Sequence, residues 1–244
     1  LGHARGHVIL RIQYFLPLPV EDYQMTLSKY KIRKIIKTLY ELYPKVETQL
    51  VHDTPFQLLI ATILSAQCTD KQVNKVVPKL FEKLPTPQKL SQASLKTIEK
   101  LIQTTGFYKN KAKNIKNCAK ALIKNYNGEV PDKLEELVQL PGVGRKTANV
   151  VLGSIFNIPG IVVDTHVKRI SQLLGFTKNK SPEKIEQDLM KIIPKKHWNN
   201  FSLHLIYLGR SLCPARKPKC QECPLNKWCE HGSKLIEDSK NIVK

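Results

Sequence analysis

The side chains best suited to chemistry in this sequence are one lysine, one aspartate and four cysteines. Lys146 follows the glycine-containing segment 140–145 (LPGVGR), and Asp164 stands in the segment 161–167 (IVVDTHV). A lysine amine can act as a nucleophile, and a carboxylate near it can move a proton or stabilise positive charge. The cysteines with metal-site spacing lie close together near the end of the chain: Cys213, Cys220, Cys223 and Cys229. The sequence therefore offers one site for nucleophilic chemistry and one for a metal.

The two glycines before Lys146 predict a tight hairpin between two helices. Gly142 and Gly144 let the backbone turn sharply and approach a ligand, and the amides at the start of the next helix can then bind a phosphate. A dinucleotide-binding fingerprint does not match, because Thr147 stands where its third glycine belongs. A phosphate-binding P-loop does not match either, because Arg145 separates the glycine from the lysine. The spacing leaves a helix-hairpin-helix motif.

Asp164 and Lys146 each allow a second interpretation. Asp164 precedes a helical pattern, where an aspartate commonly caps the helix through its side chain. Lys146 belongs to a strongly basic chain, in which most single lysines are solvated surface residues. Taken singly, these residues leave the choice between structure and chemistry open.

The cysteine spacing, C-x6-C-x2-C-x5-C, allows either a tetrahedral zinc ion or a cubane iron–sulfur cluster. A zinc ribbon normally has two C-x2-C pairs, and this segment has one, so the spacing favours iron and sulfur. Three basic residues between the first two cysteines give the loop positive charge: Arg216, Lys217 and Lys219. The other two cysteines, Cys68 and Cys118, stand among apolar residues and are expected to be small buried side chains.

The composition points to a polyanionic partner. The 244 residues carry 40 Lys and Arg against 20 Asp and Glu, a formal net charge of +20. A field of this strength favours nucleic acid. No apolar run is long enough to span a membrane. Four cysteines in one short segment indicate a metal site in a reducing compartment and not a disulfide framework.

Apolar residues recur at helical spacing along most of the chain, and few stretches alternate, so little sheet is expected. The first helical pattern begins at Lys29 and ends before Pro44, and a second begins at Thr54 and Pro55. A third pattern, from residue 109 to 126, carries lysines on one side: Lys109, Lys113, Lys116, Lys120 and Lys124. That side is either solvated surface or a phosphate-binding face.

Four motifs become specific when they are taken together. They are the segment 58–70 (LLIATILSAQCTD), the hairpin 140–151 (LPGVGRKTANVV), the segment 163–166 (VDTH) and the cysteine pattern of residues 213–229. In this order and spacing, from about residue 25 to residue 230, the chain resembles the endonuclease III family of the helix-hairpin-helix DNA glycosylase superfamily.

The resemblance implies an all-α fold of two lobes with the active-site cleft between them. A six-helix barrel lobe that contains the hairpin is expected for residues 48–158. An iron–sulfur cluster lobe is expected for residues 25–47 together with residues 159–230. Residues 1–24 are expected to be a poorly ordered extension or leader, and residues 231–244 a tail.

The resemblance also implies an activity. Members of that family are DNA glycosylases and AP lyases: they remove oxidised pyrimidines from duplex DNA and then nick the abasic site by β-elimination. Carried over to this sequence, Lys146 is the nucleophile that forms a Schiff base with the sugar, and Asp164 is its carboxylate partner. The residues that would hold a [4Fe-4S] cluster are Cys213, Cys220, Cys223 and Cys229.

Contacts with double-stranded DNA follow from the same resemblance. Gln67 would fill the space left by a flipped base, and Phe107, where relatives often carry leucine, would be a second wedge. Gly142 and Gly144 would hold a backbone phosphate, with a monovalent cation at the hairpin. The other expected DNA contacts are basic: Arg145, Arg216, Lys217 and Lys219.

Three other functions compete with this one. A mispaired-adenine glycosylase lacks, by resemblance, a lysine at the position of Lys146 and carries a further C-terminal domain. A DNA-binding module without activity would need neither Lys146 nor Asp164, and a redox protein would not need the hairpin. We expect a monomer acting on the nucleoid in a bacterial cytoplasm, with no membrane partner; organelle targeting by residues 1–24 is the alternative.

Overall fold

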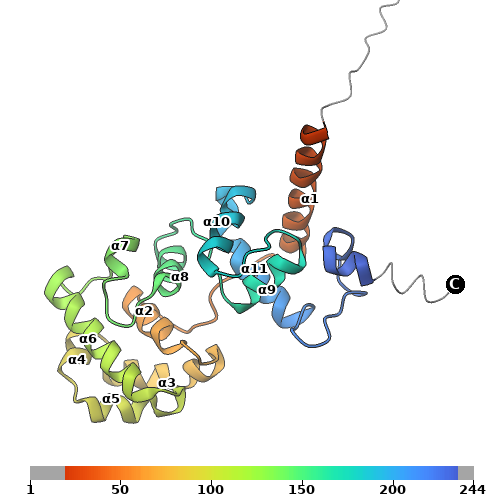
Figure 1. The fold of residues 1–244 in the computed structure, drawn as a ribbon. Helices are drawn as coiled ribbons and strands as arrows, with labels where there is room; N and C mark the ends of the chain where they lie inside the picture. The colour runs from red at the N-terminus through yellow and green to blue at the C-terminus, as the bar shows by residue number, and fades with distance from the viewer. Residues whose placement is uncertain (1–19, 236–244) are drawn as a thin grey trace, which may run out of the picture.

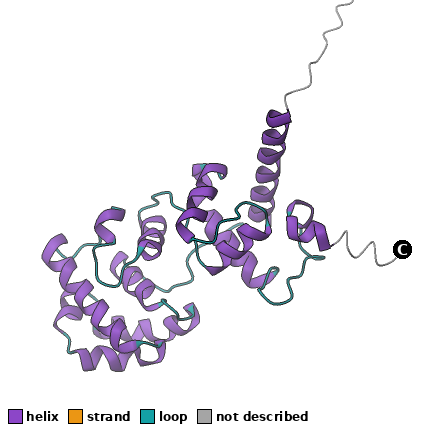
Figure 2. Ribbon diagram, viewed as in Figure 1, coloured by secondary structure: helices purple, strands orange, loops and turns teal. Residues whose placement is uncertain are grey.

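The computed structural model describes residues 20–235, and regular secondary structure in this range is helical throughout. Figure 2 shows helices joined by loops, and no strand occurs among the described residues. The predicted all-α class is confirmed. None of the described helices is long and apolar enough to cross a lipid bilayer.

Besides residues 230–235, which are also helical, eleven α-helices with defined bounds lie in the described part of the chain. They are α1 (Val20–Leu42), α2 (Pro55–Leu64), α3 (Asp70–Lys83), α4 (Pro87–Gln92), α5 (Leu95–Ile102), α6 (Tyr108–Tyr126), α7 (Leu134–Leu137), α8 (Arg145–Ile155), α9 (Thr165–Leu173), α10 (Pro182–Ile192) and α11 (Trp198–Ser211). Three short 3-10 turns accompany them: η1 (Gln103–Thr105), η2 (Lys195–His197) and η3 (Asn226–Trp228).

The helices enclose two separate hydrophobic cores. Helices α2 to α8 surround the first core, and α1, α9, α10 and α11 surround the second, which also takes in Leu225. In Figure 1 the two groups lie next to each other, joined by the segment between α1 and α2 and by the segment between α8 and α9. Because the chain leaves the second group after α1 and returns to it at α9, that group is discontinuous in sequence. The residue limits of the two predicted lobes stay predictions.

Helix α2 lies at the centre of the first core. Every residue from Phe56 to Leu64 is buried, because the sequence is apolar on all sides of the helix, a pattern typical of a central helix. The helix begins at Pro55 because the Thr54 side chain accepts a hydrogen bond from the Gln57 amide and proline suits the first turn. The predicted start of this helix is confirmed.

The start of α1 differs from the prediction. The helix begins at Val20 and not at Lys29, so residues 20–24 of the expected extension are helical. Pro17 and Pro19 made the preceding sequence look irregular, yet a proline close to a helix start is well tolerated. The rest of the expected leader, residues 1–19, and the last nine residues of the expected tail lie outside the described residues.

Candidate active site

A cleft of about 810 Å³ opens between the two groups of helices, and both predicted catalytic residues line it. Its walls come from α2, α3 and α8 of the first core, from α11 of the second, and from the connecting segments 46–52 and 157–164. Lys146 stands in the first turn of α8, and Asp164 directly precedes α9. The two groups of helices thus each bring one of the predicted catalytic residues to the same cavity.

The hairpin before Lys146 rests on neighbouring helices. Gly142 has φ +81°, and a Cβ there would lie 2.9 Å from the Asn114 Cβ and 3.2 Å from the Ile63 Cγ2. Gly142 is therefore required by both its left-handed backbone and its contact with α6 and α2. A Cβ on Gly144 would meet nothing within 4 Å, and no side chain caps the start of α8. Phosphate binding at this hairpin stays a prediction.

Asp164 caps α9 and lines the cleft at the same time. Its Oδ1 accepts a hydrogen bond of 2.8 Å from the Val167 amide. Two side chains of α11 fix the segment before it: Asn199 Oδ1 accepts from the Gly160 amide at 2.9 Å, and Ser202 Oγ accepts from the Val162 amide at 2.9 Å. The carboxylate is therefore held in a defined position at the cleft.

His166 lies in the electric field of both cleft residues. Burial lowers its pKa below the usual value; Asp164 acts against this shift, and cationic neighbours that include Lys146 add to it. The ring also packs on α11, because a Cβ on Gly209 would lie only 2.4 Å from His166 Nδ1. His166 is thus a neutral packing residue between α9 and α11, next to the charged pair.

Arg145, expected to contact DNA, makes an ion pair within the protein. Its Nε donates to Glu186 Oε2 and its Nη2 to Glu186 Oε1, each at 3.0 Å. This hydrogen-bonded carboxylate raises the pKa of Arg145. The Arg145 side chain is 52% exposed and the Glu186 side chain 8% exposed.

The two predicted wedge residues are exposed and lie on neighbouring loops. Gln67 (φ 51°) follows α2, and Phe107 (φ 47°) precedes α6; both have left-handed backbone conformations, which are uncommon for residues other than glycine. Phe107 is 66% exposed, so it is not a core residue. The elements beside these loops are joined, because Gln72 Nε2 of α3 donates to Thr104 Oγ1 of η1 at 2.6 Å. Their roles at DNA stay predictions.

The lysine-bearing helix α6 keeps most of its predicted face. Lys109, Lys113, Lys120 and Lys124 are exposed, whereas Lys116 donates to the Ala93 carbonyl at 2.6 Å. A further lysine, which the sequence analysis did not single out, points inward: the buried Lys111 Nζ donates to the Thr105 carbonyl at 2.7 Å, and burial lowers its pKa.

The sequence analysis missed a second polar connection across the cleft. Arg210 of α11 donates to Asp70 Oδ2 of α3 at 2.7 Å and also to Gln49 of the first connecting segment. All three residues line the cleft. The segment is fixed further by Asn74, which donates to the Gln49 carbonyl at 2.7 Å.

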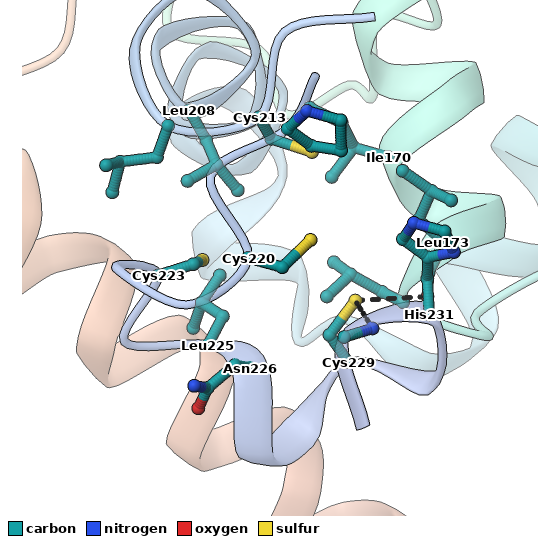
Figure 3. Close-up of a pocket in the computed structure, with 14 residues that line it drawn as sticks. Ile170, Leu173, Leu208, Cys213, Cys220, Cys223, Leu225, Asn226, Cys229 and His231 are labelled. Carbon is teal, nitrogen blue, oxygen red and sulfur yellow. Dashed lines mark hydrogen bonds between the residues drawn. The ribbon is translucent and has the colours of Figure 1, made fainter. Parts of the chain in front are cut away.

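The four cysteines of the predicted metal site line one apolar pocket, which Figure 3 shows with their sulfur atoms around a shared space. Among the described residues, no group of three or more His, Cys, Asp and Glu side chains could hold a single metal ion. Burial raises the pKa of three of the thiols, and neighbouring sulfurs add to the effect: Cys220, Cys223 and Cys229. Four thiolates in this pocket therefore need a cationic group to balance them. Donors already face two sulfurs, since Arg169 Nη1 lies 3.5 Å from Cys213 Sγ and the Gly232 amide 3.5 Å from Cys229 Sγ.

The basic residues of the cysteine loop are exposed: Arg216, Lys217 and Lys219. Lys219 lies 3.8 Å from a Glu222 oxygen, an exposed pair that contributes little to stability. Cys118 is buried as predicted, and its burial raises its pKa to about 12. Cys68 is only partly buried, so the expectation for this residue is wrong.

Comparison with protein families places this fold and cleft in a known class. Residues 60–195 match the model described as HhH-GPD superfamily base excision DNA repair protein. This match covers more than half of the chain, and the chain belongs to that superfamily.

Within the superfamily, the chain is similar to endonuclease III. It is 52% identical to endonuclease III of Synechocystis sp. over 207 residues, which are 84% of this chain and 94% of the relative. It is 46% identical to endonuclease III of Bacillus subtilis over 205 residues, which are 84% and 93% of the two chains. A solved structure described as a trapped endonuclease III–DNA covalent intermediate shares a TM-score of 0.81 and 47% identity, covering 85% of this chain and 98% of that one. The resemblance inferred from the motifs is confirmed.

Proposed function

We propose that this chain is a bifunctional DNA glycosylase and AP lyase of base excision repair. The observation that carries the proposal is that Lys146 and Asp164 reach one cleft from two groups of helices. Support also comes from relatives named endonuclease III and from similar solved structures of endonuclease III with DNA, one covalent and one non-covalent. The substrate we infer is duplex DNA that contains oxidised pyrimidines or abasic sites. We expect its site of action to be the nucleoid of a bacterial cell.

In this reaction, unprotonated Lys146 Nζ attacks C1′ of the deoxyribose of a flipped nucleotide. The bond from C1′ to the base breaks, and the base leaves with that electron pair and takes up a proton. The nitrogen then loses a proton, its lone pair forms a double bond to C1′, and the bond from C1′ to the ring oxygen breaks. The ring oxygen takes up a proton, and a protonated imine remains. The imine acidifies the C2′ proton, and loss of this proton expels the phosphate oxygen from C3′. Asp164 stabilises the positive charge that develops on the sugar.

Contacts with DNA surround this centre in the proposal. Gln67 and Phe107 enter the duplex where the base has left it, and the hairpin holds a backbone phosphate together with a monovalent cation. The loop residues Arg216, Lys217 and Lys219 bind phosphates farther along the duplex. These contacts recognise charge and shape, as an enzyme that searches undamaged DNA requires.

The cysteine pocket holds a [4Fe-4S] cluster in this proposal, with Cys213, Cys220, Cys223 and Cys229 as ligands. The donor set suits it, because all four cysteines line one apolar pocket and thiolates are the ligands of such clusters. When bound, the cluster serves as a closed structural centre. DNA contact is made by the protein itself, through the basic side chains of the loop between the first two cysteines.

Borohydride trapping on duplexes with an abasic site or thymine glycol tests the reaction. Borohydride reduces the imine to a stable amine, so the wild-type protein is expected to become covalently attached to DNA. Lys146→Gln should lower trapping by about 10³-fold or more while binding persists. Lys191→Gln, at an exposed lysine of α10, is the matched control and should trap normally. Trapping retained by Lys146→Gln removes this lysine from the role, and no trapping by the wild type contradicts the function.

A further inference from the structure

We propose that Arg145 and Glu186 are positioning residues that set the place of Lys146 relative to Asp164. The inference rests on the proposed function, in which these two cleft residues act on one sugar. Arg145 and Lys146 are consecutive in the first turn of α8. An ion pair that fixes the Arg145 side chain therefore also fixes the first turn of α8, which carries Lys146.

The pair has the geometry of a strong, directional contact. Two parallel hydrogen bonds of 3.0 Å join the guanidinium to both oxygens of Glu186. This bidentate arrangement fixes orientation as well as distance. The Asn149 amide, one turn farther along α8, lies 3.5 Å from Glu186 Oε1. Glu186 thus receives donors from two successive turns of α8.

The Glu186 carboxylate is buried and therefore needs the ion pair with Arg145. The residue is 6% exposed, and a carboxylate so far removed from water is stable only when it is paired and hydrogen-bonded. Its only ionic partner among the described residues is Arg145. The removal of Arg145 would leave the buried Glu186 carboxylate uncompensated, which is costly.

The position of the pair in the fold explains what it controls. Val151 and Leu152 of α8 belong to the first core, whereas Ile185 and Leu189 of α10 belong to the second. Asp164 caps α9, and α9 packs in this same second core. The ion pair therefore joins the helix of Lys146 directly to the core that holds Asp164.

This arrangement gives Arg145 a role other than the expected phosphate contact. Its Nε and one terminal nitrogen are occupied by Glu186, and its charge is balanced there. The effect of the pair should then appear in the chemical step, because displacement of a reacting group by about 1 Å can slow a reaction about 10²-fold. DNA affinity, which depends on phosphate contacts, should change little.

Three variants test the proposal. Glu186→Gln keeps the side-chain volume and removes the charge, whereas Glu186→Asp keeps the charge on a shorter side chain. The double variant Arg145→Glu with Glu186→Arg forms an ion pair with the two charges exchanged. The AP-lyase rate is measured in single turnovers at saturating abasic duplex, and Kd on a duplex with an uncleavable abasic analogue. We expect Glu186→Gln and Glu186→Asp each to slow the AP-lyase rate about 10–100-fold relative to the wild type, with Kd changed by less than about threefold. The exchange variant should react at least about tenfold faster than these single variants.

The control is an exposed ion pair of α1, between Lys37 and Glu41. Lys37→Gln and Glu41→Gln should leave both quantities unchanged. The proposal is overturned if both Glu186 variants, with folding verified by thermal melting, retain the wild-type rate. It is equally overturned if Arg145→Gln weakens binding and lowers the salt slope by about one while Glu186→Gln changes nothing, because Arg145 would then be a phosphate contact. Failure of the wild type to trap would contradict the proposed function instead.

Discussion

Asp164 has a cap position and a cleft position at once, so the two interpretations that the sequence allowed are compatible. Its Oδ1 accepts the Val167 amide and caps α9, while the residue also lines the cleft that contains Lys146. Capping and chemistry are compatible because a cap places the side chain at the end of a helix, where it borders open space. The hydrogen bond gives the carboxylate a fixed direction, which suits a group that must stabilise charge at one place.

Substitution of Asp164 can separate the two roles. Asn caps a helix about as well as Asp, so Asp164→Asn should change the free energy of unfolding by less than about 0.5 kcal/mol. It should still slow the single-turnover reaction about 10²–10³-fold, because the negative charge is lost. Asp164→Ala should show the same slow reaction and a further loss of about 1 kcal/mol in stability. Denaturant unfolding and single-turnover cleavage measure the two effects, and a wild-type rate in Asp164→Asn would leave Asp164 as a cap alone.

The sequence was informative at residues whose roles are local. Gly142 was predicted from its turn, and its backbone and its contact with Asn114 show why no side chain is tolerated there. Partners distant in sequence were not predictable. Glu186 lies 41 residues from Arg145, and the sequence around neither residue predicts this ion pair.

Helix α6 connects two of the expected DNA contacts at the level of a whole element. It begins next to Phe107, and its Asn114 supports the hairpin through the close approach of Gly142. The exposed lysines of α6 therefore stand on the helix that adjoins both of these features. From residue 101 to 128 the sequence contains no carboxylate that could neutralise them.

Replacement of three α6 lysines tests whether this surface binds phosphates. For Lys113→Gln, Lys120→Gln and Lys124→Gln combined, the slope of log Kd against log salt should fall by about 2–3, because each phosphate contact contributes about 0.9. The rate at saturating DNA should not change. Fluorescence anisotropy over a salt series measures the slope.

The matched control replaces three exposed lysines near α10: Lys184, Lys191 and Lys195. This triple variant loses the same total charge at another surface, so it reports the general effect of charge. Equal slopes for the two triple variants would show that the α6 lysines are solvated surface, which is the simpler interpretation of the sequence.

Element boundaries followed the local signals where these were strong. Thr54 with Pro55 marked the start of α2, and Asp164 marked the start of α9. The junction before α6 was not predictable, because its Phe107 has a left-handed backbone that only the surrounding structure imposes. The inward direction of Lys111 was missed for a similar reason: its partner is a backbone carbonyl of the preceding turn.

At the scale of the whole molecule, the cleft depends on how two cores are joined. Two chain segments connect them, and two ion pairs reach across: Arg145 with Glu186, and Arg210 with Asp70. The second pair is separated by 140 residues. The periodicity of each helix predicts which side is buried, but not which helices of different cores meet. The motifs could therefore indicate the cleft residues, while the contacts that hold the cleft required the structure.

The cysteine loop belongs to the second core only. Cys213, Cys223 and Cys229 pack against that core, and Leu225 is buried in it. The loop also touches α1, where the rings of Tyr30 and Trp228 meet edge to face at 5.7 Å between centroids. Loss of the proposed cluster should therefore loosen the second group of helices and leave the first group intact.

Cluster removal from the purified protein tests this expectation by hydrogen exchange. The untreated protein should contain iron and show a visible charge-transfer band. After removal, amides of α9, α11 and residues 213–229 should exchange faster, while those of α2 and α6 keep their protection, because exchange reports local opening. Cys220→Ser should reproduce the pattern, and Cys68→Ser, outside the loop, should keep both iron and protection. Faster exchange in α2 to the same extent would show that the two cores unfold as one unit, and zinc in place of iron would exclude the cluster.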